Sequence, residues 1–216
     1  MTATARPSSA PAGLKVASIV LAAGRSSRMA PRNKLLELVE GKPIIARVAG
    51  AALASGADPV IVVSGFEAPR IAEALRELKV TIVHNPAFEQ GLSTSLRTGL
   101  SALPADSDGV LILLGDMPEI ESADLETLMA AFAEHGRQAI CVPVRHGKRG
   151  NPVLWGAAYF AEMMSLSGDV GAKQLMARHQ ERVSEVAVGS DGILADVDTP
   201  SDLARLKTRI GSNQNV

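Results

Sequence analysis

Short apolar runs alternate along the chain with longer segments whose apolar residues recur every three or four positions. The apolar runs predict strands at Val16–Leu21, Pro59–Ser64, Val80–His84, Gly109–Leu114 and Ala139–Val144. The segments between them predict helices at Pro43–Ser55, Pro69–Leu78, Thr94–Leu103 and Ala123–His135. This alternation is typical of an α/β fold, in which a mostly parallel sheet is covered by helices on both faces. Ligands of such folds bind beyond the carboxyl ends of the strands.

The alternation changes after Arg145, where a polar, cationic loop follows. Beyond it we expect helices and one strand, at Gly156–Met164, Val170–His179, Val183–Val188 (the strand) and Pro200–Ile210. We interpret this part as a substrate-side elaboration of a single domain that spans residues 15–210. Residues 1–14, rich in Pro, Ala and Ser, are expected to form a flexible N-terminal tail or linker, and residues 211–216 a disordered C-terminal tail.

Composition narrows the class of protein. The formal net charge of −1 argues against a nucleic-acid or membrane-surface binder, because both usually need an excess of basic residues. Cys141 is the one cysteine, so a disulfide within the chain and a zinc site built on several thiolates are excluded. No apolar stretch approaches the length of a membrane span. We therefore expect a cytoplasmic protein with a local anion-binding site.

The loop after the first predicted strand contains the clearest candidate for such a site. After Leu21 come small residues that permit a close approach of the backbone, Ala22, Ala23 and Gly24. Cations and a hydroxyl follow: Arg25, Ser26, Arg28 and Lys34. Backbone N–H groups and positive charge in this position suit a triphosphate, and a lysine there would offset charge as pyrophosphate leaves. The loop has neither the Gly-Lys-Ser/Thr end of a Walker loop nor a Gly-x-Gly-x-x-Gly fingerprint. The alternative is an ordinary connection with exposed charges.

Two aspartates are candidate metal ligands. Asp116 directly follows the predicted strand that ends at Leu114, and Asp198 lies just before the helix predicted from Pro200. Mg²⁺ bound to phosphates prefers oxygen ligands and needs more than one, so we expect these two carboxylates to share it. The alternatives are that Asp116 only organises a turn, and that Asp198 or Thr199 only caps the helix.

Two further segments contain candidate ligand-binding residues. The hydroxyl-rich segment Gly91–Gly99 enters a helix and would hydrogen-bond a base or ribose, and its Arg97 would contact a phosphate; the alternative is an ordinary Ser/Thr cap. Arg149 and Asn151 in a cationic loop, with Asp169 between glycine and valine, would frame an anionic acceptor. The alternative for these three residues is a pair of solvated loops.

Taken together, these segments resemble the MobA-like nucleotidyltransferase family and, within it, the branch of the molybdenum cofactor cytidylyltransferases. They run in the family's order: Leu21–Met29 with Lys34–Leu36, Gly41–Pro43, Gly91–Leu96, Gly115–Pro118, Gly150–Val153, Gly168–Ala172 and Asp196–Pro200. The resemblance covers the chain from about Val16 to about Ile210. Where the branch often has Gly-His-Pro, this chain has Gly150-Asn151-Pro152, a departure on the acceptor side.

The resemblance implies a Rossmann-like sheet of the nucleotide-diphospho-sugar transferase type that binds an NTP and Mg²⁺. Carried over by position, the nucleotide-binding residues would be Leu21, Ala22, Ala23, Gly24, Arg25, Ser26, Lys34, Ser95 and Asp116. The catalytic residues would be Lys34, Arg28 and Asp116, the metal ligands Asp116 and Asp198, and the acceptor-binding residues Arg149, Asn151 and Asp169.

The expected reaction moves CMP from CTP to the terminal phosphate of molybdopterin-bound molybdenum, because Leu-Ala-Ala-Gly tends to accompany CTP use in this family. A molybdenum hydroxylase would be the recipient of the product. Alternatives are nucleotidyl transfer to another phosphorylated acceptor, such as a sugar or polyol phosphate, and a non-catalytic carrier of the molybdenum cofactor. A third is a co-opted oxidoreductase, which the missing dinucleotide fingerprint disfavours.

Overall fold

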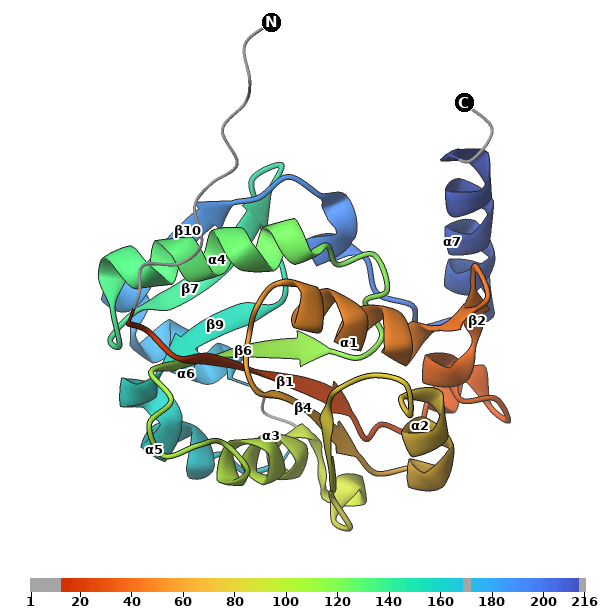
Figure 1. The fold of residues 1–216 in the computed structure, drawn as a ribbon, viewed down its shortest axis with the longest axis horizontal. Helices are drawn as coiled ribbons and strands as arrows, with labels where there is room; N and C mark the ends of the chain where they lie inside the picture. The colour runs from red at the N-terminus through yellow and green to blue at the C-terminus, as the bar shows by residue number, and fades with distance from the viewer. Residues whose placement is uncertain (1–12, 169–171, 214–216) are drawn as a thin grey trace, which may run out of the picture.

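The computed structural model describes residues 13–168 and 172–213. Its main sheet has the strand order β10-β7-β9-β6-β1-β4-β5, with β8 pairing β7 (Figure 1). The strands are β1 (Val16–Ala22), β4 (Val60–Ser64), β5 (Thr81–His84), β6 (Gly109–Leu114), β7 (Ile140–Arg145), β8 (Lys148–Arg149), β9 (Val153–Gly156) and β10 (Val183–Ala187). A separate ribbon pairs β2 (Leu38–Val39) with β3 (Lys42–Pro43).

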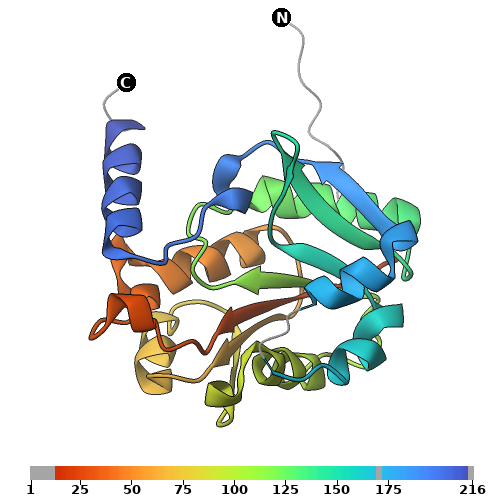
Figure 2. The same ribbon diagram turned by 180° about the vertical axis from the view of Figure 1, so that it is seen from behind.

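Helices cover both faces of this sheet, as Figures 1 and 2 show from opposite sides. One core cluster receives side chains from α1 (Ile44–Ala54), α2 (Ala68–Ala74), α4 (Ser122–His135) and α7 (Pro200–Asn213). The other receives them from α3 (Leu92–Ser101), α5 (Phe160–Met164) and α6 (Lys173–Arg178). The predicted α/β class with a mostly parallel sheet is confirmed, since only β8 and β9 pair antiparallel with their neighbours in the main sheet.

The central strand β1 is buried on both faces, which explains why its sequence is apolar at every position except Ser18. Val16, Val20 and Ala22 pack into the cluster beneath α1 and α4, whereas Ile19 and Leu21 pack into the cluster beneath α3. Successive side chains of a strand point to opposite faces, so a strand covered on both sides needs apolar residues at every position. β1 therefore lies in the middle of the molecule, and its carboxyl end opens between β4 and β6.

The helix predicted over Gly156–Met164 is present from Ala157, as a 3-10 turn over Ala157–Tyr159 that continues into α5. The strand before it was missed: Val153–Gly156 forms β9, which lies antiparallel between β6 and β7. A run of four apolar residues is too short to show a periodicity, and its strand character comes from pairing with segments distant in sequence.

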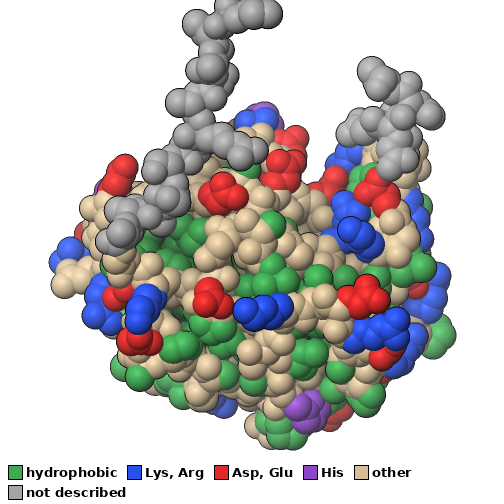
Figure 3. Space-filling view, viewed as in Figure 1, with side chains coloured by type: hydrophobic (Ala, Val, Ile, Leu, Met, Phe, Trp, Pro, Cys, Tyr) green, Lys and Arg blue, Asp and Glu red, His purple; other side chains and the backbone are tan. Residues whose placement is uncertain are grey.

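Near the C-terminus one helix is longer than predicted. α7 runs through Asn213, beyond the predicted end of the helix. Residues 1–12 and 214–216 of the predicted tails lie outside the described residues. Within the described residues, no helix combines the length and the apolar character needed to cross a bilayer. Acidic and basic side chains are interspersed over the face shown in Figure 3, in keeping with the net charge of −1.

Candidate functional site

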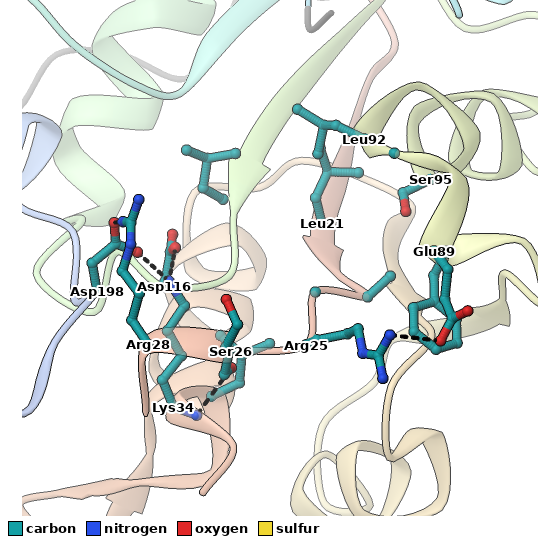
Figure 4. Close-up of a pocket in the computed structure, with 17 residues that line it drawn as sticks. Leu21, Arg25, Ser26, Arg28, Lys34, Glu89, Leu92, Ser95, Asp116 and Asp198 are labelled. Carbon is teal, nitrogen blue, oxygen red and sulfur yellow. Dashed lines mark hydrogen bonds and ion pairs between the residues drawn. The ribbon is translucent and has the colours of Figure 1, made fainter. Parts of the chain in front are cut away.

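A cavity of about 580 Å³ opens at the carboxyl ends of β1 and β6. This is the edge at which parallel α/β sheets bind ligands. Its walls come from the loop after β1, the start of α3, the end of β6 and the segment before α7. It is lined by Leu21, Ala23, Gly24, Arg25, Ser26, Ser27, Arg28, Lys34, Leu35, Phe88, Glu89, Gly91, Leu92, Ser95, Leu114, Asp116 and Asp198. Figure 4 shows the charged cluster on one side of the cavity and Leu92 and Ser95 on the other.

Lys34 bridges the two aspartates on the charged side. Its Nζ lies 2.6 Å from Oδ2 of Asp116 and 2.7 Å from Oδ1 of Asp198. Arg28 donates a hydrogen bond to the other oxygen of Asp198. Only 14% of the Lys34 side chain is exposed, so these ion pairs are partly shielded from water. Three residues that are far apart in sequence thus form one charged cluster.

Backbone contacts explain why Asp198 reaches this cluster. The N–H of Val197 donates to the carbonyl of Asp116 at 2.9 Å, which holds the two segments side by side. Asp202 lies in the first turn of α7 and accepts from the N–H groups of Asp198 and Thr199 at 3.2 and 2.7 Å, while Oγ1 of Thr199 accepts from the N–H of Asp202 at 3.2 Å. Thr199 therefore caps α7, in a reciprocal capping box with Asp202, as one of the alternatives from the sequence had it. The carboxylate of Asp198 takes no part in the cap and is turned to Lys34.

The ion pairs shift the protonation equilibria of the cluster. The hydrogen bond from Lys34 lowers the pKa of Asp198 below its usual value, against the effect of burial. Burial by itself would lower the pKa of Lys34, but the charges and hydrogen bonds of Asp116 and Asp198 outweigh it and raise that pKa. At neutral pH the lysine is therefore a fixed cation and Asp198 a fixed anion.

The aspartates also fit a divalent cation. Oδ1 of Asp116 is buried and has no hydrogen-bond partner, which is costly unless a ligand supplies one. Carboxylate oxygens are the ligands that Mg²⁺ prefers. In the described part of the chain, no three acidic, His or Cys side chains gather around one point. Two carboxylates would therefore share the cation with phosphate and water oxygens.

The loop after β1 is fixed by Ser26, which adopts the left-handed conformation with φ of 52°. Its Oγ accepts from the backbone N–H of Lys34 at 3.2 Å and donates to Oδ1 of Asn33 at 3.3 Å. A non-glycine residue in this conformation is strained, and such strain gathers at binding sites. Farther along the cavity, Arg25 forms an ion pair with Glu89 at 2.9 Å.

The opposite wall is built around Ser95, which is 4% exposed. Its Oγ accepts a hydrogen bond from Nδ2 of the buried Asn85 at 3.0 Å. Asn85 and Glu89 were not predicted as site residues, because their one signal in the sequence is a polar stretch between a strand and a helix. Arg97, which we expected to contact phosphate, instead donates to the carbonyl of Leu166 at 2.8 Å and does not line the cavity.

A second cavity, of about 570 Å³, adjoins the first. The two share Leu21, Leu92 and Leu114 in their linings. Most of the second lining is apolar, and its residues include Arg149 and Asn151, two of the three predicted acceptor-binding residues. Arg149 pairs with Glu185 at 2.7 Å. The third predicted residue, Asp169, lies outside the described residues.

The structure thus brings together most of the residues that sequence reasoning selected. All the predicted nucleotide-binding residues except Ala22 line the first cavity, together with Arg28 and Asp198. Ala22 is 1% exposed and packs in the core beneath α1. The functional roles of these residues remain predictions.

A mostly parallel sheet with a polar, cationic cavity at its carboxyl edge is an arrangement that suits the binding of a nucleotide. The chain belongs to the MobA-like NTP transferase domain family, whose profile matches residues 18–183, and is therefore a nucleotidyltransferase. It is 30% identical to the purine catabolism protein PucB of Bacillus subtilis over 198 residues, covering 85% of this chain and 92% of that protein. It is 26% identical to the molybdenum cofactor cytidylyltransferase of Escherichia coli over 194 residues, covering 88% and 95%.

Solved structures agree with this assignment. A nucleotidyl transferase from Methanothermobacter superposes with a TM-score of 0.80 at 26% identity, covering 93% of this chain and all of that one. The manganese complex of Rv0371c from Mycobacterium tuberculosis gives a TM-score of 0.77 at 26% identity, covering 90% and 98%. The chain also matches bifunctional GlmU proteins, but spans only about a quarter of their length: 35% identity over 57% of this chain and 26% of the Leifsonia xyli protein.

Proposed function

We propose that this protein transfers the cytidylyl group of CTP to the terminal phosphate of a molybdopterin-type acceptor and releases pyrophosphate. The observation that carries the proposal is the position of Lys34 between Asp116 and Asp198, in a polar cavity that adjoins a second, mainly apolar one. The first cavity would hold the nucleotide and the second the acceptor. The likeness to the cytidylyltransferase of Escherichia coli supports the same choice.

In the proposed reaction, an oxygen of the acceptor phosphate attacks the α-phosphorus of CTP in line. The new P–O bond forms as the bond between the α-phosphorus and the bridging oxygen to the β-phosphate breaks, and pyrophosphate leaves with that oxygen. Lys34 and Arg28 would balance the negative charge that grows on the α-phosphate and the leaving group. The acceptor phosphate is already ionised at neutral pH, so no general base is needed.

Asp116 and Asp198 would hold Mg²⁺, which neutralises the triphosphate and aligns its oxygens. Oδ1 of Asp116 has no hydrogen-bond partner and could bind the cation directly, whereas both oxygens of Asp198 are engaged by Lys34 and Arg28. Lys34 would therefore have to move away from Asp198 for both carboxylates to share the metal. The phosphates of the nucleotide provide the new partner for Lys34. In this proposal the Lys34 ammonium yields its place beside Asp116 and Asp198 to Mg²⁺ and moves to the phosphates of the nucleotide.

The lining of the second cavity bears on the acceptor. Ile112, Val153 and Trp155 contribute apolar surface, whereas Arg149 and Asn151 supply polar groups. A flat heterocycle such as a pterin gains more from such a surface than a sugar or polyol, whose hydroxyls would lose hydrogen bonds to water. We propose a molybdenum hydroxylase as the recipient of the product.

A second candidate is nucleotidyl transfer to a different phosphorylated acceptor. It is favoured by the breadth of the relatives, whose names include PucB and GlmU, and by Asn151 in place of the histidine that is frequent in the cytidylyltransferase branch. The nucleotide cavity would work in the same way, and only the group in the second cavity would differ.

The test is pyrophosphate release with Mg²⁺ and molybdopterin-bound molybdenum, with CTP, GTP, ATP and UTP offered in parallel. Release with CTP, lost in Lys34→Ala and kept in Lys42→Ala, is the expected result; Lys42 is an exposed lysine outside both cavities. Release with another nucleotide would overturn the choice of base. Nucleotide binding without release would overturn the acceptor and favour the second candidate or a carrier.

A further inference from the structure

Asn85 is a buried polar residue behind the nucleotide cavity. It follows β5 directly, is 1% exposed, and its backbone N–H donates to the carbonyl of Ser64 at 2.8 Å. Its side chain contacts two hydroxyls in the first turn of α3, Oγ1 of Thr94 at 2.8 Å and Oγ of Ser95 at 3.0 Å. The residue therefore joins the end of the sheet to the wall of the cavity.

The orientation of the Asn85 amide follows from its neighbours. The backbone N–H of Ala87 lies 3.0 Å from Oδ1 of Asn85, and this group can only donate. The oxygen of the amide must therefore face Ala87, and the nitrogen must face Thr94 and Ser95. Both hydrogens of Nδ2 are used in this way, so Asn85 is a donor to each hydroxyl.

The two hydroxyls differ in what remains for their own protons. The one hydroxyl proton of Thr94 has two acceptors within reach, the carbonyls of Gly91 at 2.8 Å and of Ala87 at 3.1 Å. For the Ser95 proton, no acceptor lies within hydrogen-bond distance among residues 13–168 and 172–213. Ser95 lines the cavity, and Figure 4 shows its hydroxyl on the cavity side of α3. Its proton is thus left for a ligand.

We propose that Asn85 is a positioning residue for nucleotide recognition: it donates to Ser95 and so directs the Ser95 proton to an acceptor atom of the nucleoside. The inference rests on the proposed function, because it requires a nucleotide in this cavity. A serine hydroxyl can both accept and donate, and by itself would not favour one use over the other. The buried amide removes that freedom before the nucleotide arrives, which lowers the cost of ordering the site on binding.

The test reverses the polarity of Asn85 with little change in shape. In Asn85→Asp the introduced carboxylate still accepts from Ala87, but it draws the Ser95 proton away from the cavity. Titration calorimetry with Mg²⁺ and CTP, without any acceptor, should show about a five- to tenfold weaker affinity in N85D and in Ser95→Ala, which corresponds to one hydrogen bond. The double variant should bind as weakly as either single variant, because both changes remove the same contact.

Thr94→Val is the matched control. It breaks the same buried network and is expected to lower the melting temperature, but it leaves the Asn85–Ser95 contact intact, so CTP affinity should stay within about twofold. An equal loss of affinity in T94V, or additive losses in the double variant, would overturn the inference and leave nucleotide transfer standing. If wild-type protein binds none of the four nucleotides, the proposed function fails as well.

Discussion

Replacing Lys34 by Met tests whether the lysine occupies the place of the metal in the nucleotide-free protein. Methionine keeps much of the length of the side chain but removes its charge, and leaves the carboxylates of Asp116 and Asp198 beside each other without their shared partner. Exposed ion pairs contribute about 0.2–1 kcal/mol, and breaking a buried one costs about 3–5 kcal/mol. For this half-buried cluster we expect a loss of about 2 kcal/mol, or about 4–8 °C in melting temperature.

Mg²⁺ should act differently on the two proteins. In K34M the cation replaces the missing ammonium: with a dissociation constant of about 1 mM, about 10 mM Mg²⁺ stabilises by about 1.4 kcal/mol, or about 3–6 °C. In the wild type Mg²⁺ competes with the ammonium of Lys34 for the same two carboxylates, and the shift should stay below about 1 °C without nucleotide. Differential scanning fluorimetry measures both, with NaCl at matched ionic strength as the screening control.

The stability difference between the wild type and K34M should depend on pH. The lowered pKa of Asp198 contributes stability that is present above its usual value of 3.8 and is lost as the pH falls through the lowered value. The raised pKa of Lys34 contributes stability that is present below 10.5 and is lost as the pH rises through the raised value. The wild-type advantage over K34M should therefore be largest between these limits. Equal Mg²⁺ shifts in both proteins would refute the reasoning.

Three further predictions concern the frame around the site. Gly192→Ala would place a Cβ 2.0 Å from the backbone carbonyl oxygen of Glu119, and should lower the free energy of unfolding in urea by about 1–3 kcal/mol. Gly50→Ala in α1 is the control: its Cβ would have nothing within 4 Å, so the substitution should stabilise the protein. Asp202 has a pKa of about 2, because the hydroxyl and the backbone N–H just before α7 donate to it. Asp202→Ala should lower the melting temperature at neutral pH, by an amount that shrinks as the pH falls towards 2. Burial raises the pKa of Cys141 to about 12, so Ellman's reagent should label it in denaturant but not in the native protein; rapid native labelling would contradict this.

The parts of the fold that could be predicted from the sequence are those with a local signal. β1, β4 and β6 are buried on both faces, so their apolar runs stand out without any knowledge of their neighbours. β9 has no such signal, because its place between β6 and β7 depends on pairing with other segments, and its partners in β6 lie more than forty positions away. Asp124 shows the same limit at one residue. It lies in the first turn of a predicted helix, where an acidic residue is ordinarily exposed, but it is buried and accepts from Ser190.

Some features of the candidate site could also be predicted from the sequence, whereas others could not. The loop after β1, Asp116 and Asp198 each follow or precede an element whose end the sequence predicts, so their common edge could be foreseen. The ion pairs of Lys34 could not, because they depend on the hydrogen bond from Val197 to Asp116, which leaves no pattern in the sequence. The cap of α7 does leave one, since Thr199-Pro200-Ser201-Asp202 has the spacing of a capping box, but the sequence did not tell whether Thr199 or Asp198 was the cap.

The boundary between the two cavities limits where the proposed chemistry can occur. Leu21 is the last residue of β1 that packs on the side of α3, Leu114 ends β6, and Leu92 begins α3. All three line both cavities. These apolar side chains cannot bind the phosphate of the nucleotide or that of the acceptor. In the proposed reaction the two phosphates can therefore meet only where polar groups lie next to the three leucines. Asp116, two positions beyond Leu114, is such a group, and Lys34 is paired to it. The α-phosphorus would therefore lie beside the Lys34 cluster, with the base towards Ser95 and the acceptor approaching past Leu114.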